Sequence, residues 1–469
     1  MDYSYNISSS GVPKCHSQET FKPLLKQLVR ATSSPPSSSS SSTNTPEPIL
    51  SDSQLVDLFE HLADPNFTTH PENHAQIGSA LTSLRLTELD KRSQTFAIAS
   101  RIFLQSCIPV EVPPLEKSLG SPPPASAAAT SDHDGLGREP TYEGALDLVG
   151  TGGDGHDTFN VSTTAAMVAA GVPGVRVCKH GAKASSSTSG SADLLLSLGI
   201  PLLHLPPKSL PKLLPRSKFS FLFAQLYHPA LAPLGPIRKS LGFPTIFNIL
   251  GPLINPARPK RCVLGVHSHY LGRSYAEALR TGGVERAWVV CGKEGLDEIS
   301  PEGETDVWEL KGGEIKEFTI SPADFGVPAH PLKHVGSQTS KENASIVLHL
   351  FGERDARGRK GESAEGNEED EIGFSPEPLP SPLPPHSSAL QDAETKDLPE
   401  VPKGVRMKAL EDYTVLQASA LLYIGGFGSD LKECASLARE SMRGGGALEA
   451  LRSFRREALQ AVESSSNRD

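Results

Sequence analysis

A glycine-rich segment, GTGGDG at 150–155, constrains the fold of this 469-residue chain more than any other feature. It follows a short apolar run at 145–150, which predicts a buried strand, and precedes small residues at 162–170, which predict a helix. Glycines let backbone N–H groups approach an anion closely, and the N-terminus of the following helix adds partial positive charge. The spacing matches neither a dinucleotide-binding fingerprint nor a Walker A loop, so an ordinary glycine-rich turn is the alternative to an anion-binding loop.

Strand-like and helix-like segments keep alternating beyond this loop. VRVCKHG at 175–181 predicts a second strand, ADLLLSLGI at 192–200 a second helix, and 270–281 a third helix. Further strands are predicted at four apolar runs, which are FSFLFAQLYHPAL from Phe219, TIFNILGPL from Thr245, RCVLGVH from Arg261 and RAWVVCG from Arg286. Such alternation is typical of an α/β fold with a mainly parallel sheet flanked by helices.

Residues 18–110 predict a small N-terminal helical domain that contains a Ser-rich insertion at 31–50. Ser51 and Ser53 are candidate N-caps of one of its helices. The apolar stripe of that helix has i, i+3, i+4 and i+7 spacing and consists of Leu55, Leu58, Phe59 and Leu62.

A larger α/β domain is predicted over 141–469, with two closing helices at 410–456. An insertion at 353–402 interrupts it and carries 13 acidic and five basic residues, which is most of the net charge of −10. Its acidic, Pro-rich composition predicts disorder. The rest of the chain is close to neutral, so the charge gives no sign of nucleic acid as a partner.

The six cysteines are scattered without a CxxC pair, which argues against a zinc ribbon and against a disulfide-stapled secreted domain. No run of 18 apolar residues occurs, so we expect no transmembrane helix. The first 18 residues lack the apolar core of a signal peptide and the arginines of a mitochondrial leader. We therefore expect a cytoplasmic protein with no membrane and no nucleic-acid partner.

Two polar segments follow the glycine-rich loop. TFNVST at 158–163 places Asn160, Ser162 and Thr163 at the start of a predicted helix, where capping is the simpler role. KHGAKASSSTSGSAD at 179–193 begins at the carboxyl end of the second strand, which is where open α/β sheets bind ligands. Its serines offer donors to a phosphate, and a flexible polar loop is the alternative. The glycine-rich loop, this serine-rich loop and Lys179 together suit a substrate with two phosphorylated ends.

Two further pairs of residues are candidates for binding. Asp297 and Glu298 follow the strand-like WVVCG, and adjacent carboxylates with waters and phosphate oxygens suit Mg²⁺, although most exposed acidic pairs are merely solvated. His228 and Arg238 lie in LYHPALAPLGPIRK. A guanidinium can bind a planar carboxylate through two parallel hydrogen bonds, but either residue alone could equally be a surface or core group.

In combination, these motifs resemble the anthranilate phosphoribosyltransferase family. The likeness rests on GTGGD, FNxST, KHG followed by SGS, HPA followed by RK, FNxLGPLxNP and the acidic pair, and it extends from Glu19 to Phe454 apart from the insertions. It implies a Mg²⁺-dependent homodimer that transfers the 5-phosphoribosyl group from phosphoribosyl pyrophosphate to the amine of anthranilate. The products would be N-(5-phosphoribosyl)anthranilate and pyrophosphate, in tryptophan biosynthesis.

The resemblance also implies site residues. Those expected to bind phosphoribosyl pyrophosphate are Gly150, Gly153, Asp154, Thr158, Asn160, Val161, Ser162, Thr163, Lys179, His180, Gly181, Lys183, Ser187 and Ser191. Those expected around anthranilate are Gly150, Ala182, His228 and Arg238, and those expected to bind the metal are Ser162, Asp297 and Glu298. No catalytic residue is expected, because the amine is already a neutral nucleophile and positioning should dominate.

The chain departs from the family pattern at three positions. Ala182 stands where the family usually has Asn after KHG, Lys183 where it often has Arg, and Pro244 where it usually has the Arg of GxRT. Two alternatives are a pyrimidine nucleoside phosphorylase-like enzyme and a catalytically silent binding or regulatory homologue. The acidic pair and the HPA motif with Arg238 argue against the phosphorylase, and the intact loops argue against the silent homologue.

Overall fold

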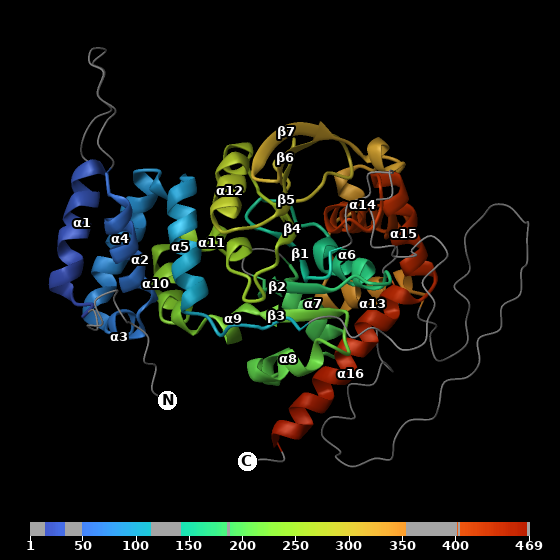
Figure 1. Cartoon of the computed structure of the whole chain (residues 1–469), viewed down its shortest axis with the longest axis horizontal. Coiled ribbons are helices and arrows are strands. Elements are labelled where there is room, and N and C mark those ends of the chain that lie inside the picture. Colours follow the sequence, from blue (N-terminus) through green and yellow to red (C-terminus); the bar gives the residue numbers. More distant parts are fainter. Residues whose placement is uncertain are drawn as a thin grey trace, which may run out of the picture.

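The computed structural model describes residues 15–32, 49–113, 142–184, 188–352, 401 and 404–466. Figure 1 shows N-terminal helices at one side, a central sheet, and C-terminal helices at the other side. Ser187, most of the Ser-rich insertion and nearly all of the acidic insertion at 353–402 lie outside the described residues.

The centre of the molecule is a seven-stranded sheet in the order β3-β2-β1-β4-β5-β6-β7. Its strands are β1 Leu146–Gly150, β2 Val177–Gly181, β3 Phe219–Phe223, β4 Arg261–Gly265, β5 Arg286–Gly292, β6 Thr305–Lys311 and β7 Glu314–Ile320. Strands β1 to β5 pair in parallel, and β6 and β7 join antiparallel. The predicted α/β fold with a mainly parallel sheet is confirmed. The carboxyl ends of the parallel strands share one edge, where Gly150 pairs with Gly265.

The two faces of the sheet are buried in different cores. Val263 and Trp288 belong to one core, while their neighbours Leu264 and Val289 belong to the other. Burial on both faces explains why the parallel strands read as almost continuous apolar runs. The helices that follow strands along the chain are α6 Val161–Ala170, α7 Ser191–Ser197, α8 Leu210–Leu213, α9 Ala224–Tyr227, α10 Leu234–Leu241, α12 His269–Thr281 and α13 Ser340–Leu350.

The N-terminal helices pack on the second core. They are α1 Gln18–Thr32, α2 Asp52–Ala63, α3 Pro65–Thr68, α4 His74–Leu86 and α5 Ser93–Gln105. Helix α2 begins after Ser51, whose hydroxyl accepts from the Gln54 N–H at 3.3 Å in a capping box, and its predicted apolar stripe is buried. The same core includes Leu234 of α10 and Leu271 of α12, so residues far along the chain complete this helical layer.

The C-terminal region forms three helices rather than the two predicted over 410–456. They are α14 Met407–Gly425, α15 Leu431–Arg443 and α16 Gly446–Ser466. The break falls at three consecutive glycines, and Gly445 has a φ of +81°. A Cβ on Gly446 would lie 2.6 Å from the Gly171 carbonyl oxygen, so the close approach of α16 to α6 requires glycine there.

One predicted strand is wrong, a second (FSFLFAQLYHPAL) ends at Phe223 where α9 follows, and two strands were not predicted. TIFNILGPL folds as the short helix α11 Ile246–Ile249 and a 3₁₀ turn, because Thr245 caps the helix with Asn248 and an apolar run of this length fits a buried helix as well as a strand. The missed β6 and β7 form a hairpin at the sheet edge. Its turn consists of Gly312 and Gly313, which both have positive φ. This Gly-Gly pair is the sequence signal that could have revealed the hairpin.

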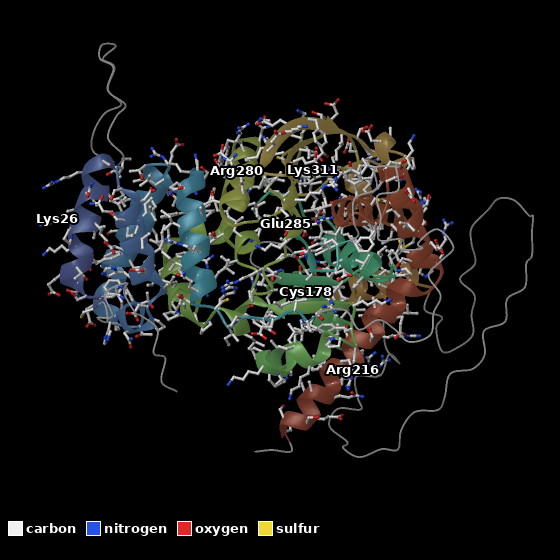
Figure 2. The ribbon with its side chains drawn as sticks, in the orientation of Figure 1. Lys26, Cys178, Arg216, Arg280, Glu285 and Lys311 are labelled. Carbon is white, nitrogen blue, oxygen red and sulfur yellow. The ribbon has the colours of Figure 1, made fainter. Side chains whose placement is uncertain are left out.

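Charged side chains lie mainly at the periphery. Figure 2 shows Lys26 at one edge of the molecule and Cys178 within the sheet layers; Lys26, Arg280 and Lys311 are exposed, whereas Cys178 is fully buried. Within the described residues, no helix combines the length and apolar character needed to cross a membrane.

Candidate active site

The candidate site lies at the carboxyl edge of the parallel strands. The segment after β5 passes so closely over β1 and β4 that side chains are excluded there. A Cβ on Gly150 would lie 2.3 Å from Asp297 Oδ2, and one on Gly265 would lie 1.5 Å from the Asp297 carbonyl oxygen. Only glycine fits at these two strand ends, so the GTGGDG loop and the acidic pair meet.

Two carboxylates, Asp154 and Asp297, meet where this segment contacts the glycine-rich loop. The N–H of Gly152 donates to Asp297 Oδ2 at 2.6 Å, and the N–H of Asp297 lies 3.5 Å from Asp154 Oδ2. Gly152 and Gly153 have φ of +69° and +81°, which turns this loop towards the acidic segment at little steric cost. The structure thus brings the predicted residues Gly150, Asp154 and Asp297 together.

The electrostatics of these carboxylates favour a cation. Burial raises the pKa of Asp297 to about 7, and the nearby charge of Asp154 adds to the rise. Burial and then the charge of Asp297 raise the pKa of Glu298 well above its usual range. Within the described residues, no three His, Cys, Asp or Glu side chains are close enough together to hold a metal ion unaided. The oxygen donors fit Mg²⁺, which commonly binds one or two carboxylates and completes its shell with water and substrate phosphates.

Glu298 is held from α14, which the sequence analysis did not place in the site. The Tyr413 hydroxyl donates to Glu298 Oε2, and the Thr158 hydroxyl lies 3.5 Å from the same oxygen. Gln417 bonds to the backbone of Ile299, the residue after Glu298. Its side chain accepts from the Ile299 N–H at 3.2 Å and donates to the Ile299 carbonyl at 2.7 Å. No local motif marks Tyr413 or Gln417, since both lie within a long helical run.

Lys179 reaches the site from within the protein. It is 1% exposed, and its Nζ donates to the Leu148 carbonyl oxygen and to Ser162 Oγ at 3.2 Å. Burial lowers its pKa, and the buried carboxylate of Asp147 opposes that change. Behind it, Asn255 donates to Asp147 Oδ2 at 2.7 Å and to the Cys178 carbonyl at 2.9 Å. The sequence analysis did not single out Asp147 or Asn255, which lie next to Lys179 in the interior.

The TFNVST segment is organised by Asn160 in a different way from helix capping. Asn160 occupies the N-cap position of α6, but its side chain makes no cap hydrogen bond. Its amide instead donates to the Ser189 carbonyl at 2.7 Å and accepts from Ser189 Oγ and from Asn343. It therefore ties this segment to the KHG loop. Val161 and Thr163 are buried, and the Thr163 hydroxyl has no partner in the described part of the chain.

The KHG loop is exposed beyond β2. Ala182 and Lys183 lie on the surface, and the Ala192 N–H donates to the Ala182 carbonyl at 3.1 Å, which places Ser191 beside the loop at the first turn of α7. Gly181 is confined by Phe221, whose ring would lie 2.8 Å from a Cβ. Ser187 falls outside the described residues, so its role stays a prediction.

Two histidines form a buried pair next to β2. The rings of His180 and His228 are 5.0 Å apart, and both side chains are nearly inaccessible to solvent. Burial lowers the pKa of His180 to about 3 and that of His228 to about 4, so both are neutral near pH 7. His180 Nδ1 lies 3.2 Å from the Gly251 carbonyl, and a hydrogen bond with the Ile254 backbone opposes the lowering of the His228 pKa.

Arg238 lies on α10, half-buried beside α11. Its guanidinium donates to Asn248 Oδ1 at 3.3 Å and lies 5.7 Å from the centre of the Phe247 ring. Its Nε has no partner in the described residues. No hydrogen bond among the described residues joins Arg238 to the glycine-rich or KHG loops. Pro244 stands where the family usually has Arg. Its carbonyl accepts from Arg85 of α4 at 3.0 Å, so a guanidinium from another helix contacts this position.

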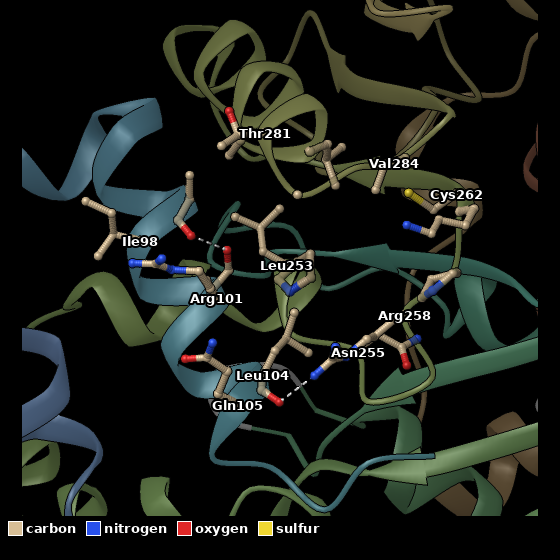
Figure 3. Close-up of a pocket in the computed structure, with 18 of the residues that line it drawn as sticks. Ile98, Arg101, Leu104, Gln105, Leu253, Asn255, Arg258, Cys262, Thr281 and Val284 are labelled. Carbon is tan, nitrogen blue, oxygen red and sulfur yellow. Dashed lines mark hydrogen bonds between the residues drawn. The ribbon is translucent and has the colours of Figure 1, made fainter. Parts of the chain in front are cut away.

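A cavity of about 690 Å³ lies away from this edge, at the opposite ends of the strands between α5 and α12. Figure 3 shows Arg101 and Leu104 of α5 facing it, with Arg258 donating to the Leu104 carbonyl at 3.0 Å. Asn255, which donates to Asp147 near Lys179, also lines this cavity. We place the candidate site at the carboxyl edge because the phosphate-type loops and the acidic pair meet there, whereas this cavity contains neither.

Comparison with known proteins agrees with this geometry. Residues 142–361 match the family model described as "Glycosyl transferase family, a/b domain". The anthranilate phosphoribosyltransferase of Schizosaccharomyces pombe is 40% identical over 309 residues, covering 66% of this chain and 73% of that protein. This chain belongs to the anthranilate phosphoribosyltransferase family. The Saccharomyces cerevisiae relative is 38% identical over 334 residues, covering 69% of this chain and 81% of that protein.

Solved structures extend the likeness to the whole fold. A structure of the Saccharomyces cerevisiae enzyme in complex with PRPP and Mg has a TM-score of 0.68 and 29% identity, covering 96% of this chain and 99% of that chain. A structure of the Thermus thermophilus enzyme has a TM-score of 0.63 and 28% identity, covering 93% and 99%. Another Saccharomyces cerevisiae structure contains 4-fluoroanthranilate.

Proposed function

We propose that this chain transfers the 5-phosphoribosyl group from phosphoribosyl pyrophosphate to the amine of anthranilate, releasing pyrophosphate, as a step of tryptophan biosynthesis. The observation that carries the proposal is the junction between the GTGGDG loop and the acidic pair, where the Gly152 N–H donates to Asp297 Oδ2 at 2.6 Å. Membership of the family and the likeness to a relative solved with PRPP and Mg support the same reaction.

In this proposal the glycine-rich, TFNVST and KHG segments hold phosphoribosyl pyrophosphate. Backbone N–H groups of the loop and the N-terminus of α6 receive the phosphates, and Lys179 adds a cation from beneath. The contact of Asn160 with Ser189 keeps the two walls of the site together. The proposed ligands are Gly150, Gly153, Asp154, Thr158, Asn160 to Thr163, Lys179 to Gly181, Lys183, Ser187 and Ser191.

Anthranilate is proposed to lie against Gly150, Ala182 and the neutral His228, with Arg238 binding its carboxylate. The unpaired Nε of Arg238 supports this assignment, since a guanidinium can present two donors in one plane to a carboxylate. The small side chain at Ala182 leaves the backbone as the contact at that position.

Ser162, Asp297 and Glu298 are the proposed residues for Mg²⁺. The raised pKa values of Asp297 and Glu298 support this, because a cation beside them would stabilise both as carboxylates. When bound, Mg²⁺ offsets the negative charge of the departing pyrophosphate. Ser162 Oγ already accepts from Lys179, which fixes the direction of its free lone pair.

The residues of this chain act by binding and orienting rather than by covalent chemistry. The anthranilate amine is already a neutral nucleophile, so it needs to be held in line with the ribose carbon rather than deprotonated beforehand. No residue is assigned as a nucleophile. We further propose a homodimer in the cytoplasm, where the exposed Cys15 and the five buried cysteines would stay reduced.

The test measures formation of phosphoribosylanthranilate and release of pyrophosphate from anthranilate and phosphoribosyl pyrophosphate, with and without Mg²⁺. We expect turnover that requires all three. Turnover of a pyrimidine nucleoside with free phosphate instead would identify a phosphorylase, and no turnover of either pair would identify a silent homologue.

A further inference from the structure

Helix α14 contacts Glu298 and the adjacent Ile299 through two side chains one turn apart. Tyr413 donates to Glu298 Oε2, and Gln417 holds both backbone polar groups of Ile299. Residues four apart on a helix share a face, so these two side chains grip the acidic segment together. Helix α14 therefore sets both the backbone path and the side-chain direction of Glu298.

The hydroxyl of Tyr413 is deeply buried and donates its hydrogen bond to a carboxylate. Tyr413 is 0% exposed, whereas Glu298 is half-buried and faces the site. A buried phenol needs a hydrogen-bond partner, and Glu298 Oε2 is that partner, with Thr158 Oγ1 3.5 Å from the same oxygen. Within the described part of the chain, no hydrogen bond reaches the other oxygen, Oε1.

We propose that Tyr413 is a positioning residue that holds Glu298 in one orientation, with Oε2 occupied and Oε1 left for a divalent cation. This inference rests on the proposed function, because it deepens the assignment of Glu298 as a metal ligand. A free glutamate side chain would lose conformational freedom on binding a cation, and the bond from Tyr413 removes that freedom in advance. Loss of such an outer partner typically weakens metal binding by about 10- to 100-fold.

The test is Tyr413→Phe in the full chain, with Mn²⁺ as the probe. Phenylalanine keeps the ring and removes only the oxygen. We expect Mn²⁺ binding in the presence of phosphoribosyl pyrophosphate, measured by electron paramagnetic resonance, to weaken by at least about ten-fold. Binding of phosphoribosyl pyrophosphate without metal, measured by calorimetry, should weaken less than Mn²⁺ binding, since Tyr413 donates to Glu298 and only the Thr158 side chain of the phosphate-holding segments bonds to it.

The matched control is Tyr423→Phe on the same helix. Tyr423 packs against Trp288 at 5.5 Å and under the Arg286 guanidinium at 4.6 Å, and no hydrogen bond among the described residues links its hydroxyl to the site. The same chemical change there should leave Mn²⁺ affinity unaltered. Circular dichroism and the unfolding midpoint monitor the fold of both variants.

A second pair of variants shows whether Tyr413 acts through Glu298. In a Glu298→Gln background, Tyr413→Phe should have no further effect on Mn²⁺ affinity, because the group it positions is gone. Equal Mn²⁺ affinity of Tyr413→Phe and the unmodified chain would overturn the proposal, and so would an undiminished effect in the Glu298→Gln background. If Tyr413→Phe failed to fold while the double variant folded, the bond would be structural and the proposal would also be wrong.

The failure of this inference is distinguishable from failure of the proposed function. An unmodified chain that makes phosphoribosylanthranilate and binds Mn²⁺, with a Tyr413→Phe variant that binds it equally well, would sink the role of Tyr413 alone. An unmodified chain without saturable Mn²⁺ binding would overturn the metal site and the role of Tyr413 together.

Discussion

Two buried aspartates at opposite ends of the same sheet meet different electrostatic surroundings. Asp147, at the amino end of β1, accepts from Asn255 at 2.7 Å and faces the cation of Lys179. Asp297, after the carboxyl end of β5, accepts from a backbone N–H but faces the carboxylates of Asp154 and Glu298. Burial raises the pKa of Asp147 to about 6 and that of Asp297 to about 7.

In the proposed function, this difference separates Asp147, whose charge is structural, from Asp297, whose charge binds a ligand. The chain supplies its own counter-charge at the amino end, so that Asp147 belongs to the internal support of Lys179. At the carboxyl end it places negative charges near one another, and the charge of Lys179 offsets them only in part. Clustered like charges in a buried place are costly to folding, and such arrangements concentrate at binding sites.

Removing the carboxylates at the carboxyl end should have the largest effect. We expect the double variant Asp297→Asn with Glu298→Gln to lower Mg²⁺-dependent kcat by about 1,000-fold, in the range for loss of a transition-state charge partner. The fold should persist, because the amides keep the shape and remove repulsion. Steady-state kinetics over a Mg²⁺ series measures the loss. Glu304→Gln, at an exposed position on the following loop, is the control and should respond to Mg²⁺ like the parent. A double variant with the parent's Mg²⁺ response would contradict the metal assignment.

Removing the carboxylate at the amino end should instead cost stability. Asp147→Asn leaves the buried Lys179 without its counter-charge, and we expect about 3 kcal/mol less free energy of unfolding in urea. Lys179→Met in the same chain should restore part of that loss, because both charges are then gone. Strictly additive losses in the double variant would show that the two side chains do not interact.

Protonation of the buried histidines should lower stability in acid. Since burial holds the pKa of His228 near 4 in the folded chain and the unfolded value is about 6.5, the unfolded chain binds more protons between these pH values. The contribution of His228 is therefore fully present above pH 6.5 and is lost as pH falls towards 4, by about 3 kcal/mol. Urea titrations of the parent and His228→Gln across this range should differ in slope by up to about 1.4 kcal/mol per pH unit. Parallel pH profiles would contradict a buried neutral His228.

Arg238 tests whether the carboxyl edge has a second, separate anion site. Arg238→Ala should lower kcat/KM for anthranilate by about ten- to a hundred-fold, which corresponds to loss of a charged hydrogen bond of about 1.5–3 kcal/mol. Binding of phosphoribosyl pyrophosphate, followed by calorimetry, should stay near the parent value. Equal losses for both ligands would mean that Arg238 supports the fold through Asn248 and Phe247.

The smallest effect is expected from the acidic insertion. Replacing residues 356–398 with a short Gly/Ser linker should change neither turnover nor the unfolding midpoint, because the composition of this segment cannot offset the entropy of ordering it. Loss of cooperative unfolding in the shortened chain would show that the segment is structural.

Local patterns predicted much of the sheet and of the site. The strands β1, β2, β4 and β5 lie where short apolar runs end in glycine, and the GTGGDG loop and the acidic pair fall at their carboxyl ends. TIFNILGPL was misread because a short apolar run fits either a strand or a buried helix. The motif HPA followed by RK indicated Arg238 as a site residue. The sequence does not show whether Arg238 contacts the glycine-rich or KHG loops.

What the sequence determined by itself is the order of strand, loop and helix along the chain, because apolar periodicity, glycine and capping residues act over a few neighbours. What only the tertiary structure decided is which charges meet. Asp147 faces Lys179 across two strands, and Tyr413 reaches Glu298 over a separation of 115 residues. Such pairings depend on how helices pack on the sheet, and packing joins residues whose separation leaves no local pattern to read.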